Sequence, residues 1–304
     1  MNKRKFFLSL VTTLLILGVV AVGIGLSSSD IDLRDALDPA DSPRLNILVV
    51  GVDKDGARSD VNMLFSLDTD KKSIQLLSIP RDTRVEYKKG YYGKINACIG
   101  KEDGEELLVE TVKKMTGLPI HNFCKVDFEG LRNIIDILGG VEFDVPMNMD
   151  YDDPVQDLHI HLKKGKQVLN GAEAEGLLRY RKGYATGDLG RIDMQQAFIK
   201  EAARQKLRPK YILKAIPVAK EITESVETDM SVIQMLKYAW KLRSSNKLEL
   251  NTHVLPGAPK TIGGASYYIC DKNATQRLVR NEFGYEDGKD ISQENRSISE
   301  KVID

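Results

Sequence analysis

An uncharged apolar run near the N-terminus places the strongest constraint on how this chain can fold. Residues 6–26 read FFLSLVTTLLILGVVAVGIGL, and Lys3, Arg4 and Lys5 precede them. A helix of this length spans about 30 Å, the thickness of the hydrocarbon core of a bilayer. Because basic flanks stay in the cytoplasm, we predict a single-pass transmembrane helix at residues 6–26, with residues 1–5 inside and the rest outside the cell membrane.

A cleaved signal peptide is the alternative interpretation of this run. Its apolar core would be unusually long, and no clear A-x-A cleavage site follows it. The residues beyond it, 27–44, have no sustained periodicity and are predicted to be a polar linker. One extracellular domain is expected at residues 45–283, and residues 284–304 are predicted to be a polar, flexible tail.

The domain begins with sequence patterns that are typical of a buried sheet. LNILVVGVD, residues 45–53, is a continuous apolar run, and two strand-like segments at residues 61–68 and 73–80 suggest a hairpin. Segments of helical periodicity alternate with further strands after them, for example at residues 105–117 and in the helix that starts close to Arg191. We therefore predict an α/β fold, a mixed central β-sheet covered by helices.

Charge and cysteine content narrow the function classes. The chain has 44 basic and 44 acidic residues. A nucleic-acid-binding protein is normally basic overall or along one stripe, so no nucleic-acid partner is expected. Three cysteines are too few for a disulfide framework and are interpreted as small buried hydrophobic residues. A Cys98–Cys124 bridge remains open.

Arginines and aspartates occur together in three separate stretches, at predicted strand ends and in a glycine-rich loop. The stretches are GVDKDGARSD with Asp53, Arg58 and Asp60, SIPRDT with Arg81 and Asp82, and the loop with Arg179, Arg181, Asp188 and Arg191. Arginine binds phosphate oxygens in a bidentate manner, and aspartates hold hard cations such as Mg²⁺. Together they would form a diphosphate site, whereas separately each would be a surface salt bridge. No GxGxxG or Walker-type loop indicates a nucleotide.

A second, smaller cluster is found in DLHIHL. Asp157, His159 and His161 alternate along a predicted strand and would share one of its faces, as metal ligands do. Solvent-facing strand residues are the alternative interpretation, because no further ligand is close in the sequence.

Seven segments together resemble the LytR–CpsA–Psr family, in the order that the family has them. They are NILVVGVD, ARSDVNMLFSLDTDKKSIQLLSIPRDT, KINACIG, VDFEGLRNIIDILGGVEFDVP, LNGAEAEGLLRYRK, GDLGRIDMQQ and LPG…SYYI. The resemblance runs from about Leu45 to Phe283. It implies an α-β-α sandwich with an apolar pocket for a polyprenyl chain, anchored in a Gram-positive type of envelope.

The resemblance also implies an activity. Members of the family are phosphotransferases that move a glycopolymer, a teichoic acid or capsular polysaccharide, from an undecaprenyl-pyrophosphate carrier to a peptidoglycan hydroxyl. By motif, Asp53 and Asp60 would bind Mg²⁺, with Mn²⁺ as the alternative. The residues expected around the pyrophosphate are Arg58, Arg81, Arg179, Arg181, Arg191 and Gln195. Of these, Arg81, Arg179, Arg181 and Arg191 are expected to be catalytic.

Two other functions stay open at this point. A site open to water would hydrolyse the polyprenyl pyrophosphate with the same residues. A non-enzymatic, lipid-binding regulator of envelope genes is the second alternative, although the predicted topology leaves only five residues in the cytoplasm. The sequence does not indicate which residue would act as the general base.

Overall fold

The structure is a computed structural model of the 304-residue chain. It describes residues 43–52, 56–126, 128–153, 158–184, 186–206, 226–230, 234, 238, 249–286 and 288–290. The predicted transmembrane helix at 6–26, most of the linker and most of the helical pattern at residues 229–245 lie outside the described residues. No described helix is long and apolar enough to cross a membrane.

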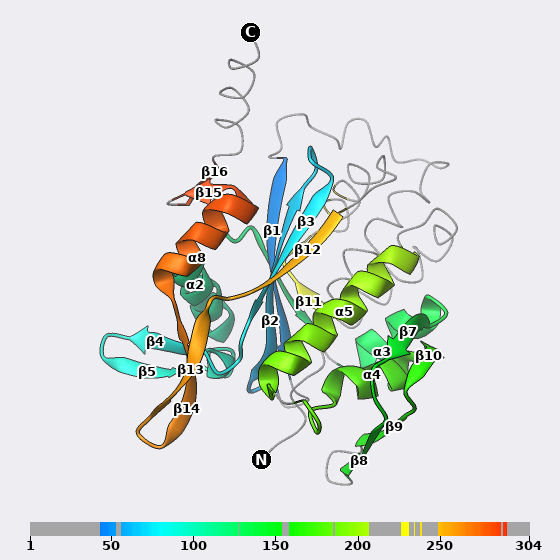
Figure 1. The fold of residues 1–304 in the computed structure, drawn as a ribbon. Coiled ribbons are helices and arrows are strands. Elements are labelled where there is room, and N and C mark those ends of the chain that lie inside the picture. Colours follow the sequence, from blue (N-terminus) through cyan, green and yellow to red (C-terminus); the bar gives the residue numbers. More distant parts are fainter. Residues whose placement is uncertain are drawn as a thin grey trace.

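A mixed six-stranded sheet forms the centre of the molecule (Figure 1). Its strand order is β11-β6-β1-β2-β3-β12. The strands are β1 (Arg44–Val52), β2 (Ser59–Asp68), β3 (Ser73–Ile79), β6 (Asn122–Val126), β11 (Val226–Thr228) and β12 (Glu249–Val254). β1, β2 and β3 pair antiparallel, whereas β1 with β6 and β3 with β12 pair parallel. This confirms the predicted mixed sheet and its first hairpin.

Helices cover both faces of the sheet, so every residue of β1 and β2 is buried. This explains why the sequence of β1 is continuously apolar rather than alternating. One face carries α3 (Phe128–Ile137), α4 (Gly171–Arg179) and α5 (Asp188–Lys206). The opposite face carries α2 (Gly104–Thr116), α8 (Lys272–Leu278) and the π-helical turn Val279–Phe283.

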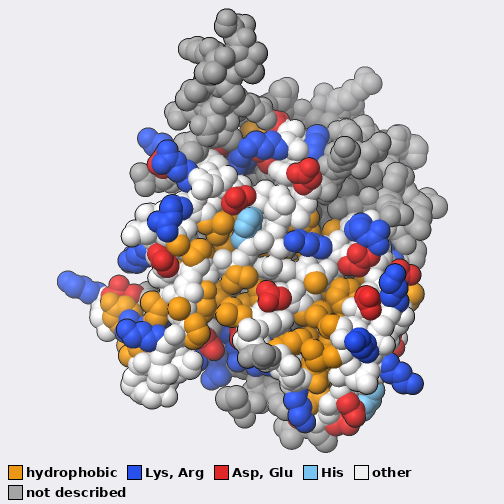
Figure 2. All heavy atoms as spheres, viewed as in Figure 1, with side chains coloured by type: hydrophobic (Ala, Val, Ile, Leu, Met, Phe, Trp, Pro, Cys, Tyr) orange, Lys and Arg blue, Asp and Glu red, His pale blue; other side chains and the backbone are white. Residues whose placement is uncertain are grey.

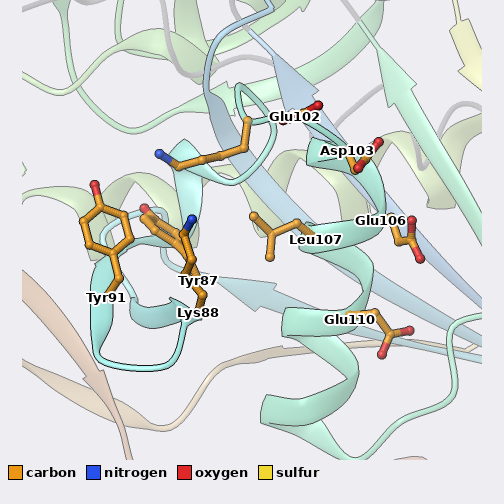
Figure 3. A pocket seen from close by; sticks show the side chains of 9 residues that line it. Tyr87, Lys88, Tyr91, Glu102, Asp103, Glu106, Leu107 and Glu110 are labelled. Atoms are coloured by element: carbon orange, nitrogen blue, oxygen red, sulfur yellow. The ribbon is translucent and has the colours of Figure 1, made fainter.

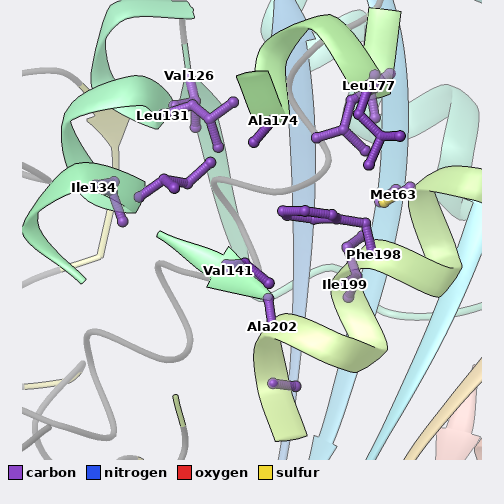
Figure 4. Packing of buried hydrophobic residues seen from close by; sticks show 14 of the residues in the cluster. Met63, Val126, Leu131, Ile134, Val141, Ala174, Leu177, Phe198, Ile199 and Ala202 are labelled. Atoms are coloured by element: carbon purple, nitrogen blue, oxygen red, sulfur yellow. The ribbon is translucent and has the colours of Figure 1, made fainter. Parts of the chain in front are cut away.

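The larger apolar cluster lies between the sheet and α3, α4 and α5 (Figure 4). Phe198 of α5 points into its middle, is fully buried and packs at 5.3 Å between ring centroids against Phe143. Alanine at this position would leave a cavity bordered by residues from the sheet and from several helices.

We expect Phe198→Ala to lower the free energy of unfolding by about 3–5 kcal/mol, since the cavity adds to the lost transfer free energy. Chemical denaturation monitored by circular dichroism would measure this loss. Val168→Ala is the control, because Val168 is 60% exposed and should change stability little. An equal loss in both variants would contradict this assignment of the core.

Paired strands extend from the central body. They are β4 (Arg84–Lys88) with β5 (Tyr91–Lys94), β7 (Val141–Val145) with β10 (Gly165–Leu169), β8 (Met149–Asp153) with β9 (Leu158–Leu162), and β13 (Gly257–Ile262) with β14 (Ala265–Cys270). A short 3₁₀ turn, Ile95–Ala97, follows β5. Most of these strands are short and partly exposed, which explains why sequence periodicity missed several of them.

Part of the predicted tail is ordered. β15 (Tyr285–Glu286) and β16 (Lys289–Asp290) pair with each other, and Tyr285 is buried in the second apolar cluster. Arg44 at the start of β1 lies 5.4 Å from the Tyr285 ring and forms a 3.2 Å ion pair with Asp290. Residues 285–286 and 289–290 of the predicted tail are therefore in regular structure, and Arg44 holds this segment against the domain.

The cysteines do not form a bridge. All three are free thiols, and Cys98 and Cys124 are buried in the two apolar clusters on opposite faces of the sheet. Burial raises the pKa of Cys98 to about 11, so it is a thiol at neutral pH. The interpretation of these two residues as small buried hydrophobic groups is confirmed, and the Cys98–Cys124 bridge is excluded.

Candidate functional site

One edge of the sheet gathers the carboxyl ends of β1, β3, β6 and β12, because these four strands run in the same direction. Ligands of α/β proteins bind at such an edge, where loops rather than strands close the surface. The predicted site residues Asp60 and Arg81 lie here, at the start of β2 and directly after β3.

A β-bulge presents Asp60 at this edge. Gly51 pairs with Val61 and Val52 pairs with Ser59, so Asp60 is the extra residue of the bulge. Bulges bend a strand and redirect a side chain, often beside an active site. The carboxylate is 1% exposed and forms a 3.0 Å ion pair with the guanidinium of Arg81.

Several backbone hydrogen bonds fix the turn that carries Arg81. The Thr83 amide donates to the Pro80 carbonyl, and the amides of Asn96 and Tyr268 donate to the carbonyls of Arg81 and Asp82. Burial lowers the pKa of Arg81, but attraction by Asp60, Asp188 and Asp82 outweighs it, so the pKa is raised. The guanidinium is therefore a permanent, oriented positive charge.

The glycine-rich loop reaches this turn from more than a hundred residues away in the chain. Burial, and then repulsion by Arg81, lower the pKa of Arg181 to about 10, against the attraction of Asp188, Asp60 and Asp82. These mutual effects place the five side chains in one electrostatic cluster. We call Asp60, Arg81, Asp82, Arg181 and Asp188 the arginine cluster. The two guanidinium groups of Arg81 and Arg181, held close to each other with little solvation, favour the binding of an anion.

The first turn of α5 lies beside the arginine cluster. Asp188 begins this helix and forms a 2.8 Å ion pair with Arg191, which is 1% exposed. Gln195 is also buried and lies one turn after Arg191 on the same helix face. A helix N-terminus adds a partial positive charge, so it supports an anion at this point.

Two glycines let the loop turn into α5. Gly187 has a φ of +59°, in the left-handed region that glycine adopts without steric cost. A Cβ atom on Gly190 would lie 2.7 Å from the Thr186 hydroxyl and 2.9 Å from Cβ of Tyr184. These two glycines of the motif therefore have a conformational role.

Gln196, the neighbour of the predicted Gln195, fastens the helix to the sheet. Its amide donates to the Ser78 hydroxyl at 2.9 Å and to the His253 carbonyl at 3.0 Å. This places α5 across β3 and β12.

Arg179 belongs to a different network. It is buried near the end of α4 and forms a 2.6 Å ion pair with Glu175, one helical turn earlier. Arg132 of α3 pairs with the other oxygen of Glu175 at 2.9 Å. Burial lowers the pKa of Arg179, partly offset by Glu175 and Asp153. Arg179 is thus held by α3 and α4, and its role at the pyrophosphate stays a prediction.

The remaining predicted residues lie on the first loop. Arg58 is exposed in the segment that leads into β2. Asp53 lies outside the described residues, directly after the last residue of β1. Of the two predicted metal ligands, the structure therefore describes only Asp60.

Asp82 and Asp188 stand in the arginine–aspartate stretches that the sequence indicates, without a role given by motif, and Lys94 was not selected. Asp82 and Asp188 belong to the arginine cluster, and Lys94 forms a 2.9 Å ion pair with Asp82. Asp82 directly follows Arg81 in SIPRDT and Asp188 lies three residues before Arg191 in GDLGR, so adjacency to these arginines was the signal for both, whereas KINACIG has no arginine beside Lys94.

The donor set of the arginine cluster suits Mg²⁺. Its carboxylates, of which Asp60 is the most buried, offer the hard oxygen ligands that this ion takes. Its arginines suit substrate phosphates, whose oxygens would complete the coordination of the ion. Asp60 at the bulge would be the described ligand.

Apolar residues border the cluster on the side of α4 and α5. Tyr180 and Tyr184 flank Arg181 in the sequence, lie 6.0 Å apart between ring centroids, and pack with the larger apolar cluster. Hydrophobic side chains are also visible at the surface over this part of the molecule, at the lower right of Figure 2. A charged site therefore adjoins an apolar region, as an amphiphilic ligand requires.

A separate, open groove of about 830 Å³ lies between the β4–β5 hairpin and the start of α2 (Figure 3). Tyr87 and Tyr91 form one wall and acidic residues of the α2 side the other. The ammonium group of Lys101 lies 5.0 Å from the Tyr87 ring and 5.8 Å from the Tyr91 ring. None of its lining residues belongs to the arginine cluster.

Known proteins are similar to this chain over most of its length. The model of the LytR_cpsA_psr family matches residues 27–283. The polyisoprenyl-teichoic acid–peptidoglycan teichoic acid transferase TagV of Bacillus subtilis strain 168 is 30% identical over 253 residues, which cover 80% of this chain and 64% of TagV. TagU of the same strain, which has the corresponding name, is 26% identical over 92% of this chain and 96% of its own length.

Solved structures show the same fold. The crystal structure of B. subtilis TagV aligns with a TM-score of 0.69 at 29% identity, covering 81% of this chain and 99% of that one. A structure of protein gbs0355 from Streptococcus agalactiae aligns with a TM-score of 0.71 at 20% identity, over 88% of this chain and 93% of that one.

Proposed function

Because this chain belongs to the LytR–CpsA–Psr family, we propose that it is a membrane-anchored phosphotransferase that moves a glycopolymer from an undecaprenyl-pyrophosphate carrier to a peptidoglycan hydroxyl. The names of TagV and TagU favour teichoic acid as the glycopolymer, with capsular polysaccharide as the other candidate. The catalytic domain is proposed to lie outside the cell membrane, tethered by the apolar segment at residues 6–26.

The convergence of Arg81 and Arg181 with Asp60 and Asp188 carries this proposal. These residues come from three separate segments, and each guanidinium can bind two oxygens of a diphosphate. Tyr180 and Tyr184, the aromatic residues beside Arg181, would contact the polyprenyl chain, while the diphosphate stays at the polar edge of the sheet. A substrate that joins a lipid to a diphosphate satisfies both environments.

The arginines act on the charge that develops during transfer. The acceptor oxygen attacks the phosphorus on the glycopolymer side of the diphosphate, and the bond from this phosphorus to the bridging oxygen breaks. Undecaprenyl phosphate leaves with the bonding electrons, so negative charge grows on the bridging oxygen and the oxygens of the phosphoryl group. Arg81 and Arg181, already oriented, would stabilise this charge without reorganisation.

Asp188 is proposed as the base that accepts the proton of the attacking hydroxyl. Its ion pair with Arg191 orients the carboxylate at the start of α5. Burial raises the pKa of Asp188 despite the attraction of Arg81 and Arg181, which makes it a stronger base than an ordinary aspartate. Mg²⁺ held by Asp60, with Asp53 as the expected second ligand, would neutralise charge on the diphosphate oxygens.

A defined donor assay tests the proposal. The purified full-length chain is incubated with a polyprenyl-pyrophosphate glycopolymer and Mg²⁺, with and without peptidoglycan. Transfer predicts a glycopolymer–peptidoglycan phosphodiester and polyprenyl phosphate, formed only with acceptor. Release of glycopolymer phosphate at the same rate without acceptor would instead make the protein a hydrolase. Binding without turnover would favour the lipid-binding regulator.

The pH dependence of transfer tests the role of Asp188. A base works only when ionised, so the rate should be constant above its pKa and fall below it. Because burial raises that pKa, we expect the fall to begin at higher pH than for an ordinary aspartate. Asp188→Asn should lower transfer by about 10²–10⁴-fold and remove this acidic limb. Asp193→Asn, an exposed position on the same helix, is the control. An unchanged acidic limb in Asp188→Asn would exclude the role.

A further inference from the structure

The β8–β9 hairpin carries a cluster of histidines and aspartates away from the arginine cluster. The register pairs Asp150 with His161 and Asp152 with His159. Residues between them, such as Ile160 and Leu162, are buried, whereas these four side chains are exposed. Since side chains alternate between the two faces of a strand, the four lie together on the outer face of the hairpin.

The distances within this cluster approach those of a metal site. One ligand atom each from Asp152, His159 and His161 lies within 4.8 Å of the others, a convergence that no other group of three described histidine, cysteine or acidic side chains achieves. His161 Nε2 lies 3.4 Å from Asp152 Oδ1, and His159 Nδ1 lies 2.5 Å from the same oxygen. Ligands bound at about 2.0–2.2 Å to a tetrahedral ion are roughly 3.3 Å apart. A bound ion would require His159 Nδ1 and Asp152 Oδ1 to move apart to about this distance.

Asp150 supplies an independent indication. Its carboxylate lies 2.7 Å from His161 Nδ1, on the side of the ring away from Nε2. A carboxylate that accepts from Nδ1–H leaves the Nε2 lone pair available, and metal-binding histidines in proteins are held by this arrangement. Ordinary surface ion pairs would not require Nε2 of His161 to face Asp152 while Nδ1 of the same ring faces Asp150.

We propose that the outer face of the β8–β9 hairpin binds a divalent transition-metal ion of the Zn²⁺ class through His159, His161 and Asp152. Asp150 orients His161, and water takes the fourth position, because the cluster is exposed. Imidazole nitrogens favour Zn²⁺, Ni²⁺ or Cu²⁺ over Mg²⁺ and Ca²⁺, which take oxygen ligands. This site is therefore distinct in place and in ion from the proposed Mg²⁺ position at Asp60.

A bound ion would also stabilise the packing of the hairpin against α4. β9 packs on α4, where Ile160 lies so close that a Cβ atom on Gly176 would be 3.3 Å from its side chain. The inner face of the hairpin thus supports the helix that ends at Arg179. Joining β8 to β9 through a metal would hold this support in its folded register and raise the stability of the domain.

Calorimetry with Zn²⁺ tests the proposal. The full-length chain, purified without a histidine tag and treated with a chelator, is titrated in millimolar Mg²⁺ so that the arginine cluster does not compete. We expect one Zn²⁺ per chain with a dissociation constant in the micromolar range. Co²⁺ should give the visible absorption of a tetrahedral site, and the Tm should rise by about 5 °C at a hundredfold excess over the dissociation constant.

Variants assign the ligands. His161→Gln should weaken Zn²⁺ binding at least 100-fold, and Asp150→Asn by about 10–100-fold, as expected for a residue that orients a ligand. His121→Gln is the matched control, since His121 accepts a hydrogen bond from the Asn46 amide elsewhere in the fold. Both hairpin residues are exposed, so circular dichroism should show unchanged folding. Equal Zn²⁺ affinity in the parent and in His159→Gln/His161→Gln, or no Zn²⁺ binding by the parent, would overturn the proposal.

Discussion

Arg81→Ala should lower the rate of glycopolymer transfer per folded molecule by about 10³-fold or more, in addition to the stability lost when the buried Asp60 carboxylate loses its partner. Removing one preorganised donor from a charge-stabilising site costs about 10²–10³ in rate, and an arginine at a transferring phosphoryl group about 10³–10⁵. Arg81 is also the arginine that the structure holds most firmly at the sheet edge, through Asp60 and the turn after β3. The donor assay described above, run under single-turnover conditions, would measure the change.

Lysine at the same position separates charge from geometry. Arg81→Lys keeps one positive charge but loses the planar fork, so we expect most of the loss to remain, and the same holds for Arg181→Lys. Arg84→Ala is the matched control, because Arg84 lies three residues further on, 4.0 Å over the ring of Tyr92 and outside the arginine cluster. Full transfer activity in Arg81→Lys or Arg181→Lys would contradict bidentate recognition of the diphosphate.

Asp60→Asn should affect both stability and activity. Asp60 and Arg81 form a buried pair in which the side chains are 1% and 15% exposed. Removing one partner leaves an uncompensated buried charge, which costs about 3–5 kcal/mol of unfolding free energy. Transfer should also fall by at least about 10²-fold, since the proposed Mg²⁺ ligand and the orientation of Arg81 are lost together. Denaturant unfolding and the donor assay measure the two effects.

The opposite end of the same strand provides the control for this variant. Asp68 of β2 is buried and pairs with Arg44 at 3.1 Å, far from the arginine cluster. Asp68→Asn should also lower stability, although by less because Arg44 keeps its ion pair with Asp290, and it should leave the transfer rate of the folded fraction unchanged. If Asp68→Asn abolished transfer as completely as Asp60→Asn, the effect at Asp60 would be one of stability alone.

Sequence patterns identified β1, β2 and β3 because these strands are buried almost throughout and are therefore largely apolar. They were less informative at the periphery, where β4, β5, β8 and β13 are short or exposed and their pairing decides their structure. The position of β6 beside β1 could not be read from periodicity, since a parallel crossover leaves no local signal.

The histidine hairpin shows the same limit on a smaller scale. Sequence proximity suggested Asp157 as the companion of His159 and His161, and Asp157 lies outside the described residues. The cross-strand register instead brings Asp150 and Asp152 to these rings. Ligands from two strands are adjacent in space although a loop separates them in the chain, so spacing along one strand could not reveal them.

The sequence by itself determined the types of group at the site, the membrane-length apolar run, the buried strands and the family to which the chain belongs. Only the tertiary structure decided which arginines meet. Arg179 falls one helical turn after Glu175 and pairs with it, whereas Arg181, beyond the end of α4, reaches Asp60 and Arg81. The type of a side chain fixes what it can bind. The packing of the sheet against α4 and α5 sets the distances between charged groups that are remote in the chain.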